Sequence, residues 1–215
     1  MMDRQPLSWR DALAAAAVLA AAAGMAAALT DGFERWTFEA LRRARALNGA
    51  LHAGPVPLID SRATPLQAFG APPQCAAQVL MVDFIYTRCL TVCQTLGVEF
   101  HQMQERVRGT APRPALLSIS IDPARDGPAD LAAYARMHKA DAALWALAAP
   151  ATPAGARRLA RQLGVVAVPD GLGGFVHNGS VHVMDACGRV HGIFDHADWA
   201  RALHLGQQVA ARASP

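Results

Sequence analysis

The chain has 215 residues, of which 53% are hydrophobic and 17% are charged. With an N-terminal segment set aside, about 165 residues remain, which suits one globular domain with a single core. The formal net charge is +3 and comes from arginines spread along the chain, with Lys139 as the single lysine, so nothing indicates a nucleic-acid partner.

The first predicted element is an apolar segment at residues 12–29, which contains 18 uncharged residues. Its length fits either a short membrane-spanning helix or the core of a long signal peptide, and both imply export. Ala26-Ala27-Ala28 could form a cleavage site, so retention and cleavage both stay open, and a buried alanine-rich helix of a soluble protein is a third reading. We assign residues 1–30 as an N-terminal signal anchor or transmembrane helix.

Residues 31–52 are predicted to form an amphipathic linker helix. Apolar side chains recur on one helical face between Phe38 and Leu47, with arginines elsewhere. The segment would lie along the membrane surface, extend the anchor, or act as a solvated linker. More arginines follow the apolar segment than precede it, which opposes the usual positive-inside bias, so charge does not settle the orientation. The arginines compared are Arg4 and Arg10 before it and Arg35, Arg42, Arg43 and Arg45 after it.

The remaining residues, 53–215, are predicted to form one α/β domain. A long apolar strand at residues 79–86 precedes a helix that carries Cys89 and Cys93, and a second apolar strand follows at residues 115–121. A strand, a helix and a parallel strand form a right-handed crossover. Parallel strands first and a hairpin last predict a thioredoxin-like domain, with a central mixed sheet flanked by helices. The later predicted elements are a helix at 128–139, a strand at 144–147, a helix at 153–163, an irregular stretch at 169–175, a hairpin from 180–185 and 189–194, and a C-terminal helix.

The two cysteines of this helix predict a reactive or metal-binding pair. The positive end of a helix favours thiolate over thiol. Side chains at i and i+4 have Cβ atoms about 5–6 Å apart, which is wider than the roughly 3.5–4.5 Å of an unstrained disulfide. A metal with bonds to sulfur of about 2.3 Å accepts this spacing. Cys89 and Cys93 are therefore expected to bind a metal ion together, and they could also oxidise reversibly to a disulfide. The alternative is two buried, inert cysteines, against which the polar neighbours Thr87 and Gln94 argue.

A third ligand is expected among the eight histidines. Thiolates select Cu(I), and one added imidazole gives a three-coordinate site that can hold either copper oxidation state. His101 lies eight residues beyond Cys93, about 12 Å along the helix axis, which is too far to share a metal. His177 lies in the loop before the hairpin, and in a thioredoxin-like sheet this loop faces the cysteines. A solvent-exposed loop histidine is the alternative reading.

Three motifs resemble the SCO/SenC family of copper-binding, thioredoxin-like assembly factors of cytochrome c oxidase. Residues 84–93 are similar to the family's strand and CxxxC signature, and residues 120–128 to its DPxRDxP loop. His177 keeps the family's spacing to Asp185 and to Gly188 in the hairpin turn. The resemblance covers residues of roughly 56–205, and CxxxC alone would be a weak signal.

The resemblance implies that Cys89 and Cys93 are copper thiolates and that His177 is the imidazole ligand of Cu(I) or Cu(II). The implied function is a copper metallochaperone that delivers copper to the binuclear copper site of cytochrome c oxidase during its assembly. The implied partners are the copper-bearing subunit of the oxidase, other copper chaperones and thiol reductants. The implied location is the bacterial inner membrane, with the soluble domain facing the periplasm.

The sequence departs from the family at four positions around these ligands. Leu90 and Gln94 stand where the family usually has prolines, and Val176 and Asn178 replace the usual acidic residue before the histidine and the Ser or Thr after it. We expect copper ligation to survive these changes, and partner choice, redox potential and metal release to be affected by them. The alternative functions are a membrane-tethered thiol-disulfide oxidoreductase that reduces acceptor cysteines, and a redox or copper sensor.

Two further features leave alternatives open. Asp122, Arg125 and Asp126 form either an exposed patch that docks a partner or orients the metal loop, or an Asp-capped turn with an internal Arg–Asp pair. Cys75 and Cys187 either pair in an oxidising compartment or remain isolated thiols.

Overall fold

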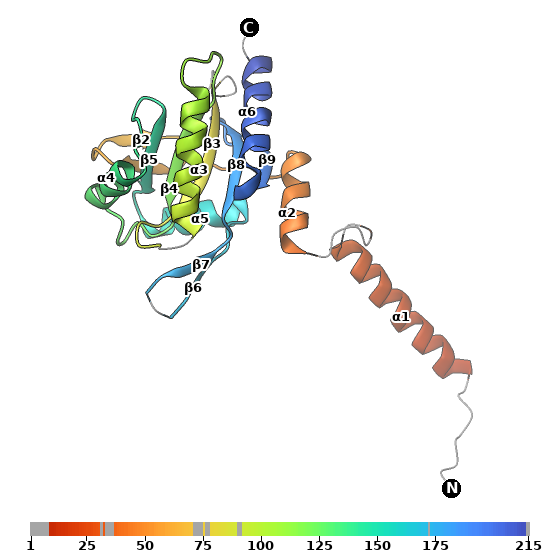
Figure 1. The fold of residues 1–215 in the computed structure, drawn as a ribbon. Coiled ribbons are helices and arrows are strands. Elements are labelled where there is room, and N and C mark those ends of the chain that lie inside the picture. Colours follow the sequence, from red (N-terminus) through yellow and green to blue (C-terminus); the bar gives the residue numbers. More distant parts are fainter. Residues whose placement is uncertain are drawn as a thin grey trace. The chain divides into compact units, whose positions relative to one another are not determined.

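The computed structural model describes residues 9–30, 32, 37–70, 75, 78–89, 92–171 and 173–213. The chain divides into two compact units, Met1–Ala44 and Arg45–Pro215. The larger unit carries the sheet (Figure 1). It also contains all of the predicted site residues.

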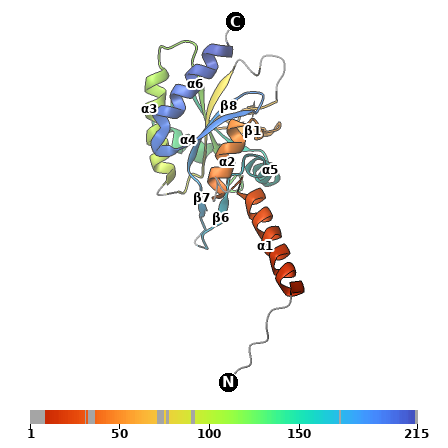
Figure 2. The same ribbon diagram turned by 90° about the vertical axis from the view of Figure 1, so that its right-hand side faces the viewer.

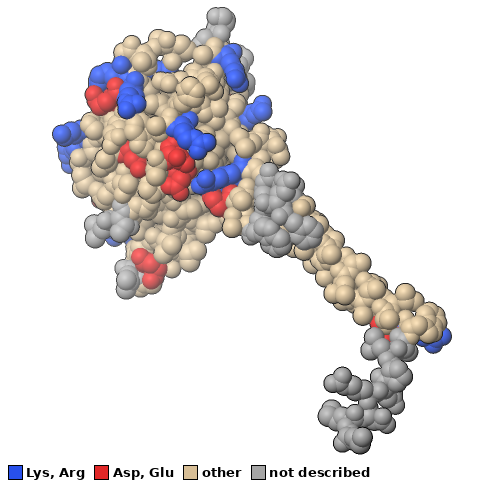
Figure 3. Space-filling view, turned by 45° about the vertical axis from the view of Figure 1, so that its right-hand side comes forward, with Lys and Arg blue, Asp and Glu red and all other residues tan. Residues whose placement is uncertain are grey.

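The N-terminal unit contains one helix that is long and apolar enough to cross a membrane. Helix α1 spans Trp9–Leu29, and its 21 residues correspond to about 30 Å of helix. Arg10 and Asp11 stand at its N-terminal end, and Figure 3 shows the rest of α1 without charged side chains. The predicted apolar helix is therefore present, as a candidate membrane span by length and composition.

A second helix, α2, spans Phe38–Leu47. Its first-turn Glu39 pairs with Arg42 at 2.8 Å and with Arg43 at 2.9 Å, at the helical spacings that stabilise such pairs. Arg4 and Arg35 lie outside the described residues. The boundaries at residues 30 and 52 stay predictions.

The main sheet has seven strands in the order β2-β1-β5-β4-β3-β8-β9. Strands β3, β4 and β5 are parallel, while β8 and β9 add to one side and β1 and β2 to the other in antiparallel pairs. This mixed sheet confirms the predicted fold class. The strand bounds are β1 Pro57–Asp60, β2 Pro65–Gln67, β3 Val79–Ile85, β4 Ala115–Ser120, β5 Trp145–Pro150, β8 Ser180–Asp185 and β9 Val190–Asp195.

Helices cover both faces of this sheet because its central strands are apolar throughout. All seven residues of β3 are buried, and alternate side chains enter two different cores. Met81 packs with α3, α4 and α6 on one face, and Val82 packs with α5 on the other. Figures 1 and 2 show α3 and α6 beside each other, on the opposite side of the sheet from α5. The helix bounds are α3 Val92–Val107, α4 Pro128–Met137, α5 Pro153–Leu163 and α6 Trp199–Ala213, with a short 3-10 helix at His196–Asp198.

The stretch between α5 and β8 differs from the prediction. Instead of an irregular segment, it forms a two-stranded antiparallel ribbon of β6 (Ala167–Pro169) and β7 (Phe175–His177). The ribbon is separate from the main sheet and extends away from it (Figure 1). Its strands are three residues long, which is too short for an alternating pattern to be read from sequence. His177 therefore ends a strand rather than lying in a loop.

Candidate metal centre

The two cysteines follow strand β3 at the carboxyl edge of the parallel strands. The turn that leaves β3 is closed by a hydrogen bond of 3.1 Å from the Cys89 backbone N–H to the carbonyl oxygen of Tyr86. Among the described residues α3 begins at Val92, so Cys89 precedes the helix instead of sharing it with Cys93. The sulfur of Cys89 lies 3.4 Å from the backbone nitrogen of Cys93 and accepts its hydrogen bond. The premise of two cysteines on one regular helix was therefore wrong, although their sulfurs are close.

The structure brings the three predicted ligands together. The donor atoms of Cys89, Cys93 and His177 all lie within 4.8 Å of one another. The Nε2 atom of His177 is 3.3 Å from the Sγ atom of Cys93, although 84 residues separate them. A trigonal ion with metal–sulfur bonds of about 2.3 Å needs its ligand atoms about 4 Å apart. This cluster is thus close to the spacing that such an ion requires, and both cysteines are free thiols.

Burial controls the protonation of these groups. Cys93 is fully buried, and burial, reinforced by Cys89 and Asp83, raises the pKa of its thiol. Burial of the Cys93 thiol therefore opposes the effect of the helix start, which was expected to favour a thiolate. Burial also lowers the pKa of His177, which leaves a neutral imidazole with a free lone pair near pH 7. A bound cation would displace the protons of the two buried thiols and compensate the charge of the thiolates that result.

Tyr86 positions the ribbon that carries His177. Its hydroxyl donates a hydrogen bond of 3.1 Å to the carbonyl oxygen of Phe175 and accepts one of 3.2 Å from the Phe175 N–H. The Tyr86 ring also contacts the rings of Phe175 and His177 edge-on, with centroids 5.6 and 5.9 Å apart. Strand β7 is thereby attached to the last turn before Cys89.

The loop after β4 contacts both halves of the site. The buried carboxylate of Asp126 accepts hydrogen bonds from the Thr87 N–H at 3.1 Å, the Thr87 hydroxyl at 2.7 Å and the Ser120 hydroxyl at 2.6 Å. Arg125 pairs with Asp122 at 2.6 Å and donates to the carbonyl oxygen of Gly173 at 2.5 Å. The internal Arg–Asp pair considered above is present, and the same loop also orients the cysteine turn and the ribbon. The alternative of an exposed patch is wrong for Asp122 and Asp126, which are both buried.

Sequence reasoning missed two tyrosines of this site. Tyr86 was noted only as the end of a strand, and its partner Phe175 lies 89 residues away. Tyr134 on α4 donates a hydrogen bond to the carbonyl oxygen of Cys93 across a separation of 41 residues. No local pattern identifies such contacts, because the hydroxyl groups find their partners only through the sheet topology.

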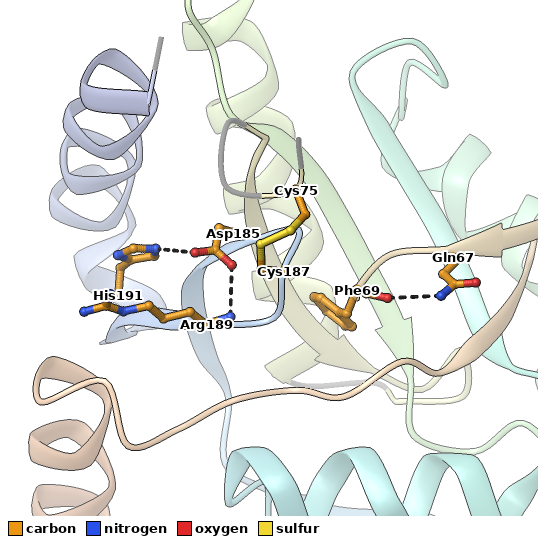
Figure 4. Close-up of a disulfide and its surroundings, with 7 residues drawn as sticks. All are labelled: Gln67, Phe69, Cys75, Asp185, Cys187, Arg189 and His191. Atoms are coloured by element: carbon orange, nitrogen blue, oxygen red, sulfur yellow. Dashed lines mark hydrogen bonds and ion pairs between the residues drawn. A yellow bond between two sulfur atoms is a disulfide. The ribbon is translucent and has the colours of Figure 1, made fainter. Parts of the chain in front are cut away.

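Cys75 and Cys187 form a disulfide, which resolves the alternative left open by the sequence (Figure 4). It joins the segment before β3 to the turn between β8 and β9. In that turn Asp185 accepts a hydrogen bond from the Arg189 N–H and pairs with His191, both at 3.0 Å. The disulfide lies at the start of β3 and the metal centre beyond its end, about 20 Å apart along seven strand residues.

Comparison with known proteins identifies a family. A family model described as SCO1/SenC matches residues 68–210. No curated protein sequence matches the chain. Solved structures with the same fold include a SCO1/SenC family lipoprotein from Bacillus anthracis, with 17% identity, a TM-score of 0.65, and coverage of 76% of this chain and 96% of that chain. ScoI from Bradyrhizobium japonicum, solved with copper bound, has 23% identity, a TM-score of 0.57 and coverage of 75% and 97%. Yeast Sco1 with copper bound has 16% identity, a TM-score of 0.58 and coverage of 74% and 88%.

Proposed function

Since the chain belongs to the SCO1/SenC family, as its motifs indicated, we propose that it binds one copper ion and delivers it to the binuclear copper site of cytochrome c oxidase during assembly. Cys89 and Cys93 supply two thiolates and His177 supplies Nε2. The observation that carries this proposal is the approach of these three donor atoms to within 4.8 Å of one another.

The chemistry of the donors supports copper in particular. Two thiolates and one imidazole suit Cu(I), and a site with three ligands leaves one side of the ion open, whereas structural zinc takes four protein ligands. Binding of Cu(I) releases the protons of both thiols, so affinity rises with pH while the thiols are protonated in the free protein. Solved relatives from Bradyrhizobium japonicum and yeast carry copper.

The copper ion is released to a partner by ligand exchange. An incoming thiolate attacks the open side of the ion and replaces one protein ligand at a time. Cys89 lies in the turn after β3, Cys93 in the first turn of α3 and His177 at the end of β7, so His177 can withdraw with its ribbon while both sulfurs stay beside the main sheet. Oxidation of Cys89 and Cys93 to a disulfide would remove both thiolates and abolish affinity.

The proposed location is the inner membrane, with the larger unit in the periplasm. Helix α1 supplies an anchor of sufficient length. The Cys75–Cys187 disulfide fits an oxidising compartment rather than the cytoplasm. In this setting the copper-bearing subunit of the oxidase is the acceptor, and copper chaperones and thiol reductants load the site and keep it reduced.

A thiol-disulfide reductase or a redox or copper sensor would use the same cysteines. A reductase needs an accessible thiolate as nucleophile. Here the exposed fractions of Cys89 and Cys93 are 2% and 0%, and burial raises the pKa of the Cys93 thiol. These properties weigh against rapid attack on a substrate disulfide and favour the metal-binding role.

The test is copper stoichiometry and transfer with the full-length chain in detergent. The native chain should bind one Cu(I) and pass it to the purified metal-free copper-bearing domain of the oxidase subunit. Cys89→Ser, Cys93→Ser and His177→Ala should each lose most of the affinity, while His204→Ala on the exposed face of α6 should not. Full copper binding by His177→Ala would refute the site. Rapid reduction of a disulfide in the acceptor, unaffected by His177→Ala and without copper transfer, would favour the reductase.

A further inference from the structure

A groove of about 510 Å³ lies beside the metal centre, between α5, the loop after β4 and the β6–β7 ribbon. Ile121, Val165 and Phe175 line it with apolar surface. Phe175 is also the residue that Tyr86 holds and lies two positions before His177. A molecule seated in the groove therefore contacts the same ribbon that carries the imidazole.

The charge of the groove is positive and unneutralised. Its charged lining residues are Asp122, Arg157 and Arg161. Asp122 is already paired with Arg125 at 2.6 Å. Arg157 and Arg161 are exposed, and no ion pair to either is found among the described residues. Helix α5 contains no acidic residue, and i,i+4 spacing places the two guanidinium groups on one side of it.

The shape of the groove admits side chains. Ala156 and Ala160 line it next to the two arginines, and their small side chains leave space over the helix. The ribbon presents Ala167, Pro169 and Phe175 to the groove, and Pro169 and Phe175 are paired across it, so its groove-facing side is apolar. Exposed apolar surface joined to a concave site is typical of a protein contact.

We propose that this groove docks a segment of the copper acceptor that carries apolar side chains together with one or two carboxylates. The apolar side chains fill the space over Ala156 and Ala160, and the carboxylates pair with Arg157 and Arg161. The inference rests on the proposed copper-delivery function, because the docked segment belongs to the protein that receives the ion. It adds the surface that brings the acceptor against the ribbon of His177.

A concave site favours a protein segment over a lipid surface. Membrane binding uses a protruding apolar face with cations around it. Here the apolar residues line a hollow, and the cations stand at its wall. Binding of carboxylates to exposed arginines also predicts strong salt dependence, because such pairs are screened within about 8–10 Å at ordinary ionic strength.

The test uses full-length chain in detergent and, as probe, the soluble copper-bearing domain of the oxidase subunit, titrated by calorimetry. The titration is run with the chain both reduced and metal-free and loaded with Cu(I). The double variant Arg157→Glu/Arg161→Glu should weaken binding at least tenfold. Arg158→Glu is the matched control, since Arg158 lies on the same helix but outside this groove, and it should change the dissociation constant less than threefold. Hydrogen exchange of residues 153–177 should slow when the domain binds the native chain.

The outcomes separate this proposal from the proposed function. Copper stoichiometry should stay at one in the double variant, so a loss of docking with copper retained supports the groove. Equal weakening by Arg158→Glu, or native affinity in the double variant, would overturn it. The proposal would also be overturned if hydrogen exchange at residues 153–177 slowed only in nanodiscs containing phosphatidylglycerol. That result would assign the surface to lipid. Failure of the native chain to bind copper would instead refute the proposed metal centre. Failure of the native chain to bind the copper-bearing domain, whether metal-free or loaded with Cu(I), would refute the acceptor and the docking site together.

Discussion

The hydroxyl of Tyr86 and the backbone of Phe175 form a reciprocal pair, in which the hydroxyl donates to the carbonyl oxygen at 3.1 Å and accepts from the N–H at 3.2 Å. Two segments that are 89 residues apart are thereby joined at one side chain. Strand β7 lies outside the main sheet, so this contact and that of Arg125 with Gly173 hold it against the cysteine turn. The distance between imidazole and sulfurs thus depends on side chains that bind no metal.

Tyr86→Phe should weaken copper binding without removing a ligand. The ring contacts with Phe175 and His177 remain, but the N–H and carbonyl of Phe175 lose their partner. Two lost hydrogen bonds at about 1 kcal/mol each predict a loss of roughly 2 kcal/mol in holding the ribbon. We expect three- to thirtyfold weaker Cu(I) binding in a competition titration with a chromophoric chelator.

Tyr134→Phe is the comparison for this variant. It removes a tyrosine hydroxyl that binds the carbonyl oxygen of Cys93, and Tyr134 has no hydrogen bond or ring contact with the described residues of the ribbon. Tyr134→Phe should lower the free energy of unfolding and leave the contribution of His177 to Cu(I) binding intact. His177→Ala should therefore reduce the affinity for Cu(I) by the same factor in the Tyr134→Phe background as in the native chain. In the Tyr86→Phe background the same substitution should cost less. Equal costs in both backgrounds would show that Tyr86 does not position the imidazole.

Asp126 permits a matched pair of substitutions. The carboxylate is 2% exposed and accepts three hydrogen bonds. Asp126→Ala leaves Thr87 N–H without an acceptor and should destabilise the fold by about 2–4 kcal/mol and weaken copper binding. Asp126→Asn keeps one oxygen for the Thr87 N–H, and its amide can donate to the Thr87 hydroxyl, so it should retain most of both properties. Chemical denaturation and copper titration of the two variants test this, and equal loss in both would mean that the negative charge itself matters.

The sequence was sufficient to predict the elements whose patterns are local. The apolar runs at β3 and β4, the helix that begins with proline at Pro128 and the hairpin around Gly188 are all present in the structure. His177 does lie beside the two cysteines, as expected, although the strand that holds it was not foreseen. The β6–β7 ribbon and the partners of Tyr86 were missed because three-residue strands and long-range hydroxyl contacts leave no periodic signal.

Burial is the other quantity that local patterns could not supply. Polar neighbours made Cys89 and Cys93 look accessible, whereas α4 and the ribbon cover them, with Tyr134 on one side and Tyr86 and His177 on the other. The sign of the Cys93 pKa shift follows from that cover rather than from the helix start.

Removal of the Cys75–Cys187 disulfide should lower stability and spare the metal centre. The bond spans 112 residues, and closing a loop of about 100 residues restricts the unfolded chain by up to about 4–5 kcal/mol. Cys75→Ser/Cys187→Ser should therefore shift the midpoint of chemical denaturation to lower denaturant, with unchanged copper stoichiometry. Reductant should shift the native midpoint and not that of the variant. A native chain whose mass does not rise on reduction would show that the bond is not formed.

Asp83 should make stability fall as the pH rises from about 4 to about 7. The side chain is fully buried, and burial raises the pKa of its carboxyl to about 7. The folded state therefore holds the proton at pH values where the unfolded state, with a pKa near 4, has released it. Because the folded state binds more protons across this range, stability is greatest below it and declines through it, by at most about 4 kcal/mol.

Asp83→Asn isolates this effect, since an amide has the shape of the protonated acid and does not ionise. Neither carboxylate oxygen of Asp83 makes a hydrogen bond of good geometry among the described residues, and the oxygen of an Asn amide can still accept from the neighbouring Ser118 hydroxyl, so the substitution loses little. The variant should be more stable than the native chain at pH 8, and the difference should shrink towards pH 4. Urea denaturation of the metal-free, reduced protein between pH 4.5 and 8 measures both curves, and the other titrating groups cancel in their difference. Parallel curves would mean that Asp83 is ionised in the folded protein, stabilised by contacts that form on deprotonation.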